Sequence, residues 1–221
     1  MPKPYSLIVF DWDGTLMDSE AKIVNAMQAA IADIAVPFRS REQIKNIIGL
    51  GLQEALSALF PAVDKTQSTR LVEAYRHHFL FMDQTPMPMF DGVDELLKAL
   101  GEQRYWLAVA TGKGRKGLDR VLDGCNLHHH FHITRCADEC FSKPHPLMME
   151  EIMDFVGVTP NQTLMVGDSE YDMLMAQNAG VDALAVSYGV HEKERLLSCG
   201  GPGNVLGCLD DIRELHDWLA E

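Results

Sequence analysis

The stretch that decides the fold is Ser6–Thr15, which reads SLIVFDWDGT. Its first half is an apolar run that is too short for a helix and rich in strand-forming residues, so it predicts a buried strand over 6–10. Gly14 predicts a turn directly after the strand, which lets the carboxylates of Asp11 and Asp13 converge at the edge of a sheet. Acids paired in this way can bind a cation, attack as a nucleophile or exchange protons, whereas a purely structural turn would use them to cap a helix.

Further apolar runs along the chain have the same character. They predict strands over 106–110, 163–166 and 183–186, and a less regular strand over 131–134. Between the runs, apolar residues recur at the spacing of a helix face, at Val93, Leu96, Leu97 and Leu100 and again at Leu147, Met148, Ile152, Phe155 and Val156. This alternation predicts an α/β fold with a doubly wound, mostly parallel, Rossmann-like sheet that helices cover on both faces.

One segment interrupts the alternation of strands and helices. From 19 to 88 the chain shows helical stripes and no convincing strand, and the stripes are Ile23, Met27, Ile31 and Ile34, then Leu71, Tyr75, Phe79 and Met82. We therefore expect an α/β core over 1–18 and 89–221 and an inserted all-helical domain over 19–88. An insertion after the first strand would lie over the carboxyl ends of the strands, where α/β sheets bind ligands. Asp18 and Pro88 are expected close to the hinges.

The composition excludes several classes of protein. Of the 221 residues 47% are hydrophobic and 23% are charged, which excludes wholesale disorder and a fibrous repeat. The formal net charge of −13 disfavours binding to nucleic acid or to an anionic membrane, because both carry the same sign. No apolar run approaches the roughly 18 residues of a membrane helix, the N-terminus does not resemble a signal peptide, and the cysteines include no CxxC pair. We expect a cytoplasmic protein.

A second acidic cluster, Gly167–Asp172, also follows an apolar run directly. Asp168 is therefore predicted at the carboxyl end of a strand, in the same row as Asp11, and Asp172 is predicted one helical turn further on the same face. Oxygen ligands from two strand ends suit Mg²⁺, which prefers few carboxylates together with water and phosphate oxygens. Asp168 or Ser169 can also cap the following helix, because capping and metal binding are compatible.

Two further motifs can bring hydrogen-bond donors or positive charge to the same edge. Thr111–Gly114 follows the strand over 106–110 and precedes a helix, so its hydroxyl and backbone amides can form an anion site. Lys143 precedes Pro144, which is expected to start a helix, and it can direct its ammonium group to this site. A single lysine is usually a solvated surface residue, so Lys143 is a candidate site residue only because the other three motifs predict a site at the same edge.

In this order, the four motifs resemble those of the haloacid dehalogenase-like superfamily of phosphatases. The match comprises DxDGT at Asp11–Thr15, the threonine at Thr111, the lysine at Lys143 and GDSxxD at Gly167–Asp172, and it extends over essentially the whole chain. The resemblance implies a Mg²⁺-dependent hydrolase of phosphoric monoesters that takes a small phosphorylated metabolite and is a monomer or a homodimer. It disfavours dehalogenation, because the dehalogenases of the family lack an acid at the position of Asp13.

The resemblance also implies roles for individual catalytic residues. Asp11 would be the nucleophile that forms an aspartyl-phosphate. Asp13 would be the general acid for the leaving group and then the base for water. Thr111 would hold phosphoryl oxygens, and Lys143 would neutralise charge around Asp11 and the phosphate.

The same resemblance implies the ligands of the metal and of the substrate. Mg²⁺ would be bound by Asp11, by the backbone carbonyl of Asp13 and by Asp168. Asp172 would support the metal site through water or a hydrogen bond to a ligand. The residues expected to bind the substrate or its phosphate are Thr15, Gly51, Leu52, Gly112 and Lys113.

Within the superfamily the chain most resembles the phosphoglycolate phosphatase-like branch with a small helical cap, which implies a phosphoglycolate-like or sugar phosphate substrate. The segment 48–56 resembles that branch's glycine-containing specificity turn, although two glycines also break a helix without any role in binding. The superfamily's sugar-phosphate mutases tend to carry Arg or Lys in this turn. The absence of both residues disfavours a mutase without excluding this alternative.

Two positions depart from the family pattern. Trp12 stands where Phe or Leu is commoner, and Gly112 follows Thr111 where Asn is frequent, so an amide or Lys113 would replace the usual contact.

Other interpretations of the sequence stay open. Gly112–Gly117 matches the GxGxxG fingerprint of dinucleotide-binding proteins, but the acid required about 20 residues later is not well placed and the acidic clusters stay unexplained. A Walker phosphate loop fails because Leu118 follows the last glycine. A non-catalytic binding protein on this fold is a further alternative, although all four motifs are intact. The run 128–132 contains four histidines that could bind a transition metal, but adjacent histidines rarely converge on one ion, which favours a solvated loop.

Overall fold

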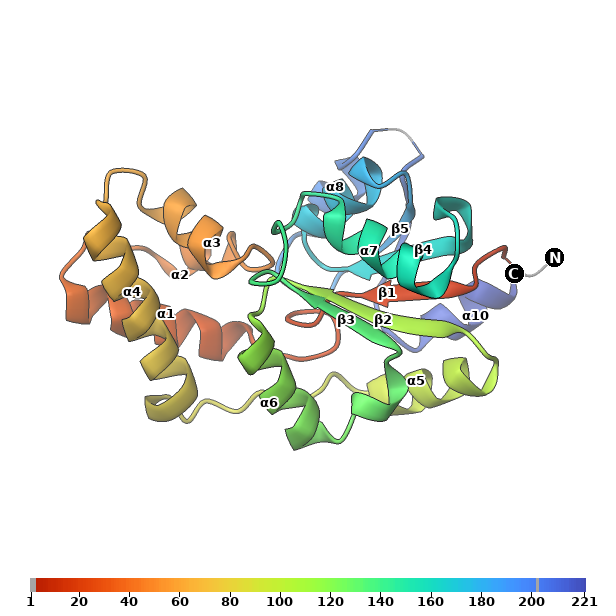
Figure 1. The fold of residues 1–221 in the computed structure, drawn as a ribbon, viewed down its shortest axis with the longest axis horizontal. Coiled ribbons are helices and arrows are strands. Elements are labelled where there is room, and N and C mark those ends of the chain that lie inside the picture. Colours follow the sequence, from red (N-terminus) through yellow and green to blue (C-terminus); the bar gives the residue numbers. More distant parts are fainter. Residues whose placement is uncertain (1–2, 202) are drawn as a thin grey trace.

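Every strand of the sheet runs in the same direction, as the alternation of apolar runs and helices predicts (Figure 1). The computed structural model describes residues 3–201 and 203–221. Met1, Pro2 and Pro202 lie outside the described residues. Pro202 belongs to the segment 200–203, where the sequence predicts a loop. In the described part the sheet has six strands in the spatial order β3-β2-β1-β4-β5-β6. Their bounds are β1 (Leu7–Phe10), β2 (Trp106–Thr111), β3 (Ile133–Cys136), β4 (Thr163–Gly167), β5 (Asp182–Val186) and β6 (Val205–Leu209).

The first strand, β1, pairs with β2 on one side and with β4 on the other. The strand order therefore reverses at β1, because β2 and β3 extend the sheet in one direction and β4 to β6 extend it in the other. Open α/β sheets bind ligands outside the carboxyl ends of their strands at such a point. Phe10 is in register with Val109 of β2 and with Val166 of β4, so the three strands end side by side. The residues that follow these strands are thereby brought together.

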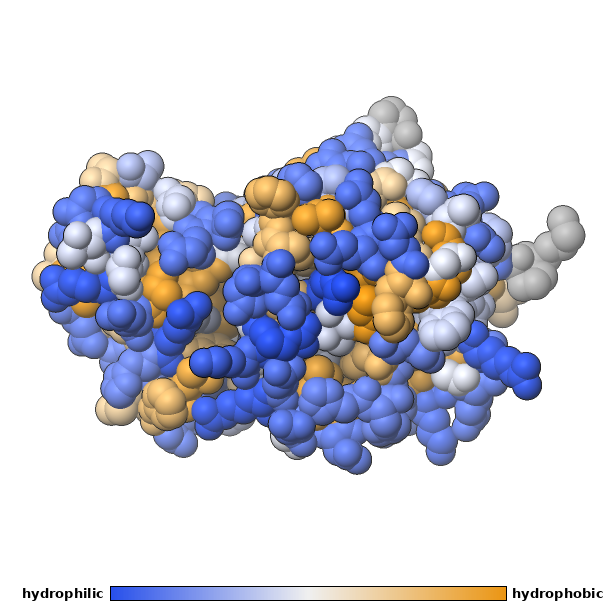
Figure 2. All heavy atoms as spheres, viewed as in Figure 1, coloured by the Kyte–Doolittle hydropathy of each residue, from blue (hydrophilic) through white to orange (hydrophobic). Residues whose placement is uncertain are grey.

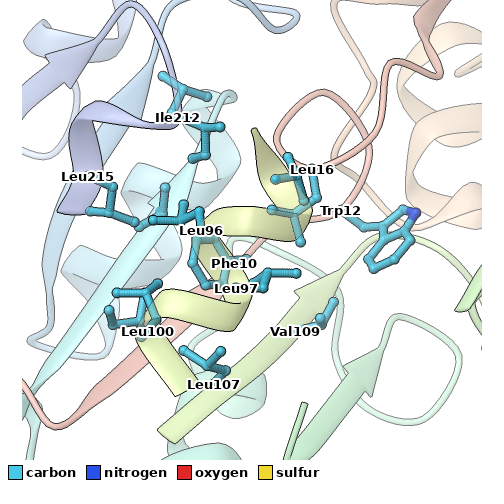
Figure 3. Packing of buried hydrophobic residues seen from close by; sticks show 14 of the residues in the cluster. Phe10, Trp12, Leu16, Leu96, Leu97, Leu100, Leu107, Val109, Ile212 and Leu215 are labelled. Atoms are coloured by element: carbon cyan, nitrogen blue, oxygen red, sulfur yellow. The ribbon is translucent and has the colours of Figure 1, made fainter. Parts of the chain in front are cut away.

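Helices cover both faces of the sheet, so the strands alternate between two apolar layers. Ile8 and Phe10 of β1 belong to one layer, part of which Figure 3 shows, whereas Leu7 and Val9 belong to the other. This two-residue period explains why β1 is apolar at every position. The helices of the first layer are α5 (Val93–Glu102), α6 (Arg115–Cys125) and α10 (Glu214–Ala220). Those of the second are α7 (Leu147–Val156), α8 (Glu170–Asn178) and α9 (Lys193–Ser198). Two 3-10 turns complete these layers, η2 (His128–His130) and η3 (Pro160–Gln162).

The segment between β1 and α5 is helical and has an apolar cluster of its own (Figure 1, left). Its elements are α1 (Glu20–Ile34), α2 (Arg41–Lys45), α3 (Leu52–Leu59), α4 (Lys65–His77) and the π-helical turn η1 (His78–Met82). The predicted stripe of α1 is buried within this cluster at Ile23, Met27 and Ile31. The chain enters and leaves the segment at one place, because the amide of Asp18 donates to the carbonyl of Pro88 at 2.9 Å.

Several elements differ from the sequence-based prediction. The less regular strand lies two residues later, at β3, and the edge strand β6 was not predicted, because Gly207 and two half-exposed neighbours break its apolar pattern. Helix α7 begins at Leu147 and not at Pro144. Phe155 is 61% exposed and not part of the core, because the stripe of α7 that packs on the sheet is made by its methionines and isoleucine. Among the described residues, no helix is both long and apolar enough to span a bilayer.

Candidate active site

Three predicted site residues meet where β1, β2 and β4 end. Asp11 follows β1 directly, Thr111 is the last residue of β2, and Asp168 follows β4 directly. All three are buried. Asp172, in the first turn of α8, joins them, and Asp11, Asp168 and Asp172 each offer a carboxylate oxygen within 4.8 Å of the others. The convergence expected from the strand ends is thus present.

Lys143 inserts its ammonium group between two of these acids. Its Nζ lies 2.7 Å from Asp11 Oδ1 and 2.6 Å from Asp172 Oδ1, and the Lys143 side chain is fully buried. Burial by itself lowers the pKa of a lysine, but the charges and hydrogen bonds of Asp11 and Asp172 outweigh it and raise the pKa of Lys143. The lysine is therefore a permanent positive charge within the acidic cluster.

Asp168 is held in place from two other parts of the chain. Its Oδ1 accepts a hydrogen bond from Thr15 Oγ1 at 2.7 Å, and its Oδ2 accepts one from the amide of Val190 at 2.8 Å. Gly14 and Gly189 face this carboxyl group so closely that an added Cβ would lie 2.1 Å and 2.2 Å from its nearest atoms. Thr15 thus supports Asp168 and does not line the cavity described below.

Asp172 completes the N-terminus of α8. Its Oδ2 accepts hydrogen bonds from the amide and the hydroxyl of Ser169 at 3.0 Å and 2.6 Å, which forms a capping box. Ser169, and not Asp168, is therefore the cap of this helix. Since Lys143 occupies the other oxygen of Asp172, both oxygens are committed to protein groups. This arrangement suits a residue that orients its neighbours.

The acidic cluster fits a divalent cation. Asp11, Asp168 and Asp172 carry three negative charges against the single positive charge of Lys143, and Asp11 Oδ2 is buried with no hydrogen-bond partner among the described residues. Burial and the charge of Asp172 raise the pKa of Asp11 well above its usual range and raise that of Asp168 to about 7. Carboxylate oxygens crowded in this way are the ligands that Mg²⁺ prefers.

Asp13 lies beside this cluster and faces an open cavity. Its Oδ1 accepts a hydrogen bond from Ser19 Oγ at 2.6 Å and forms an ion pair with Lys113 Nζ at 2.9 Å. The Lys113 ammonium also lies 4.9 Å from the centre of the Phe79 ring in the helical segment. Lys113 thus connects an acid at the sheet edge to an aromatic side chain on the opposite wall.

Thr111 and Gly112, at the end of β2, lie at the same edge of the sheet as Asp13. The Thr111 hydroxyl oxygen accepts a hydrogen bond from the amide of Lys113 at 3.1 Å. At Gly112 an added Cβ would lie 2.5 Å from the carbonyl oxygens of Gly49 and Leu50, so this position lets the turn of the helical segment approach the sheet edge. Gly112, which was expected to bind the substrate or its phosphate, therefore also has a packing role.

The turn at 46–51, between α2 and α3, is anchored on the sheet-containing part of the molecule. The Asn46 carbonyl accepts hydrogen bonds from the Tyr171 hydroxyl at 2.9 Å and from His191 Nε2 at 3.2 Å. His191 Nδ1 accepts from the amide of Glu170, so Nε2 carries the proton. The Gly51 amide donates to Ser142 Oγ at 2.7 Å. Sequence reasoning missed Asn46 and His191, because no local pattern marks two partners 145 positions apart.

A cavity of about 840 Å³ lies between the helical segment and the sheet edge. Asp11, Asp13, Thr111, Gly112 and Lys113 line its floor, and Gly51 and Leu52 lie on the opposite wall, so the cavity brings together seven of the predicted site residues. Figure 2 shows apolar residues in the recess between the helical segment, on the left, and the rest of the molecule. Sequence reasoning also missed two polar residues of the helical segment that line the cavity, Tyr75 and Arg76.

Comparison with known proteins identifies the family in which this arrangement of motifs occurs. The sequence profile of the family described as haloacid dehalogenase-like hydrolase matches residues 8–186, which include all four motifs. The chain belongs to the haloacid dehalogenase-like hydrolase family. It is 37% identical, over 86% of its own length and 84% of the relative, to the probable phosphatase IndB of Dickeya dadantii. It is 31% identical to the phosphoglycolate phosphatase of Aliivibrio fischeri, over 85% of this chain and 86% of that one.

Solved structures agree with this haloacid dehalogenase-like fold. A hydrolase from Pseudomonas syringae superposes with a TM-score of 0.87 at 24% identity, with 97% of each chain covered. The expected doubly wound sheet with inserted helices is thus confirmed. Among the described residues, the acids at the sheet edge are the one group of three or more potential ligands close enough to hold a metal, so the histidines at 128–132 do not converge.

Proposed function

We propose that this haloacid dehalogenase-like hydrolase is a Mg²⁺-dependent phosphatase that hydrolyses the phosphomonoester of a small metabolite through an aspartyl-phosphate on Asp11. The observation that carries the proposal is the carboxylate of Asp11. One oxygen is fixed by Lys143 and by the Trp12 amide, while the other is buried without a partner beside the cavity. A nucleophile needs such an oriented carboxylate with a free lone pair.

In the first half of the reaction, a carboxylate oxygen of Asp11 attacks phosphorus and forms the Asp11–phosphorus bond. The bond between phosphorus and the leaving oxygen breaks, and that oxygen takes a proton from Asp13. Asp13 is suited to this task because it lines the cavity while Ser19 and Lys113 orient its Oδ1. The proton passes from Asp13 to the leaving oxygen, so the alcohol leaves protonated.

In the second half, water attacks the phosphorus of the aspartyl-phosphate and Asp13 takes its proton. The bond to Asp11 breaks, which releases inorganic phosphate and regenerates the carboxylate. Lys143 keeps its positive charge beside Asp11 throughout, and Thr111 lines the cavity where phosphoryl oxygens would lie. Fixed charges and donors of this kind stabilise a phosphoryl-transfer transition state.

Asp11, Asp168 and the backbone carbonyl of Asp13 would hold Mg²⁺, with Asp172 as a support. When bound, the metal would offset the excess negative charge of the carboxylates and of the phosphoryl group. The glycines that frame Asp168 keep its carboxyl group in one position, which supports its assignment as a ligand.

We further propose that residues 19–88 act as a cap domain on a core of residues 1–18 and 89–221. The segment has its own apolar cluster, and its two connections run side by side between Met17 and Met89. Such paired connections allow a segment to move as a unit about a hinge. Closure over the sheet edge would exclude water while the phosphoryl group is transferred.

The first experiment is phosphate release from a panel of phosphomonoesters, with Mg²⁺ and with chelator. Mg²⁺-dependent release that is lost in Asp11→Asn establishes the proposed class of reaction. The absence of release from every compound, with folded protein, contradicts it, and a test for isomerisation of sugar phosphates then decides whether the chain is a mutase. Equal release with chelator contradicts the role of the metal.

A further inference from the structure

We propose that the substrate is a phosphomonoester whose leaving group is large and carries a planar ring that lies against the helical segment, with a polar group at the mouth of the cavity. This inference rests on the proposed function and narrows its substrate class. It goes against pyrophosphate and against a short acid such as phosphoglycolate, which the name of the Aliivibrio fischeri relative alone would suggest.

The size of the cavity is the first argument. Its volume of about 840 Å³ is close to the upper end of the roughly 300–1,000 Å³ that holds ligands of drug size. A two-carbon acid attached to the phosphoryl group would leave most of this volume empty of substrate. A ring-bearing leaving group would reach across the floor to the helical wall.

The chemistry of the wall is the second argument. Ile23 and Met27 of α1, Leu52 of α3 and Phe79 of η1 line it with aliphatic and aromatic atoms. At these four side chains, the hydroxyls of a sugar phosphate or the oxygens of pyrophosphate would lose hydrogen bonds to water and find no donor or acceptor in their place. A flat apolar ring gains binding free energy from this contact, because the contact removes apolar surface of both the ring and the wall from water.

The position of the cations is the third argument. Lys113 is paired with Asp13, and Arg115 is paired with Glu139, so these two cations of the cavity already have a counter-charge. Arg76 and Lys116 also line the cavity, are exposed, and have no ion pair or hydrogen bond to the part of the chain that the structure describes. A polar or anionic end of the substrate would therefore meet free cations only at the mouth.

Two aromatic residues mark the path between the floor and the mouth. Tyr75 lines the cavity, its hydroxyl has no hydrogen bond to a described residue, and burial together with the charge of Asp13 raises its pKa. It is thus a neutral donor beside the apolar side chains of this wall. Phe81 lines the cavity with 64% of its surface exposed, which suits a residue that packs on a substrate ring.

The test compares kcat/KM with Mg²⁺ for two sets of substrates. One set contains nucleoside 5′-monophosphates and pyridoxal 5′-phosphate, and the other contains phosphoglycolate, glucose 6-phosphate and pyrophosphate. We expect the best ring-bearing compound to exceed every member of the second set by about 50-fold or more, the gain expected from burying one ring. A preference for phosphoglycolate, pyrophosphate or the sugar phosphate, or equal values, overturns the inference and leaves the proposed function standing. Failure to release phosphate from any compound contradicts the proposed function itself.

A matched pair of variants tests the place of the ring. Phe81→Ala is expected to lower the ratio of kcat/KM between the best ring-bearing substrate and phosphoglycolate by about 10-fold. Phe38→Ala is the control, because Phe38 is also in the helical segment, is 73% exposed and does not line the cavity. An unchanged ratio in Phe81→Ala, or an equal fall in Phe38→Ala, overturns the assignment of this wall.

Discussion

Lys143 Nζ lies 2.7 Å from Asp11 Oδ1 in an ion pair that excludes solvent, because the two side chains are only 0% and 1% exposed. The pair joins the residue after β1 to a residue 132 positions later that precedes α7. It fixes one oxygen of Asp11 and leaves the other free, which is the geometry that a nucleophilic carboxylate requires.

Replacement of Asp11 by asparagine tests the nucleophile directly. An amide cannot form the acyl-phosphate, so we expect Asp11→Asn to lower kcat by about 10⁴-fold or more while the fold survives. Phosphate release and the circular dichroism spectrum measure the two effects. Asp154→Asn, at an exposed position of α7, is the control and should retain full activity. Persistent full turnover in Asp11→Asn would refute the nucleophile assignment.

Loss of Lys143 should destabilise the protein as well as inactivate it. Lys143→Met leaves the buried carboxylates of Asp11 and Asp172 without their counter-charge, which costs about 3–5 kcal/mol. We expect Tm to fall by about 10 °C when measured in chelator. Lys98→Met, on the exposed side of α5, should leave Tm within about 2 °C. An unchanged Tm in Lys143→Met would mean that the ion pair does not stabilise the fold.

The close approach of Gly189 to Asp168 predicts a metal-affinity defect. A methyl group at this position would lie 2.2 Å from the Cβ atom of Asp168, so Gly189→Ala must displace the carboxyl group. We expect the Mg²⁺ concentration for half-maximal activity to rise by about 10–100-fold. Gly124→Ala, on α6 with no atom within 4 Å of the added methyl group, is the matched control. Equal Mg²⁺ requirements in the two variants would contradict the prediction.

The stability of the metal-free protein should fall as the pH rises from about 4 to 7. Burial raises the pKa of Asp11 above the ordinary value of 3.8 and that of Asp168 to about 7, so in this window the folded state binds more protons than the unfolded state. The free energy of unfolding therefore decreases with pH, and a divalent cation restores it by binding the ionised carboxylates.

Thermal melts with Mg²⁺ and with chelator at pH 5 and pH 8 check this expectation. At a Mg²⁺ concentration 100-fold above Kd we expect Tm to rise by about 5–10 °C at pH 8. The rise at pH 5 should be smaller, because protons compete with the metal there. Sodium chloride at equal ionic strength is the control. An equal rise at both pH values would show that the buried carboxylates are not the groups responsible.

Changes at Leu52 should alter substrate preference more than the chemistry of phosphoryl transfer. Leu52 begins α3 and lines the cavity away from Asp11, so Leu52→Ala changes the shape of the helical wall. We expect the ranking of substrates by kcat/KM to shift by about 10-fold, with a smaller change in kcat for the smallest substrate. Leu197→Ala, 45% exposed on α9, should change neither quantity. A flat preference in Leu52→Ala would make the turn purely structural.

Much of the fold and of the candidate site followed from local patterns. The runs before Asp11 and Asp168 are apolar because their strands are buried on both faces, and parallel strands present their carboxyl ends at one edge. The residues after these runs could therefore be predicted as neighbours without knowledge of the fold's details. The stripe of α1 likewise predicted its buried face. Edge strand β6 escaped prediction, because a half-exposed strand with a central glycine carries little of this signal.

The assignments of particular side chains depended on distant partners. Thr15 was expected at the substrate, yet its hydroxyl supports Asp168, and Lys113 is paired with Asp13. Neither outcome follows from residue type, because a hydroxyl or an ammonium group bonds to whichever acceptor the packing brings within about 3 Å. The anchoring of Asn46 by His191 has the same origin.

By itself, the sequence determined that a parallel α/β sheet carries acids and a lysine at one edge, with helices inserted after the first strand. These features depend on the period of apolar residues and on short motifs, both of which are local. The tertiary structure alone decided that β1 lies between β2 and β4, that Lys143 inserts between Asp11 and Asp172, and that an apolar wall faces them across a cavity. The reason is that contacts between residues far apart in the sequence depend on how whole layers pack, which no local spacing specifies.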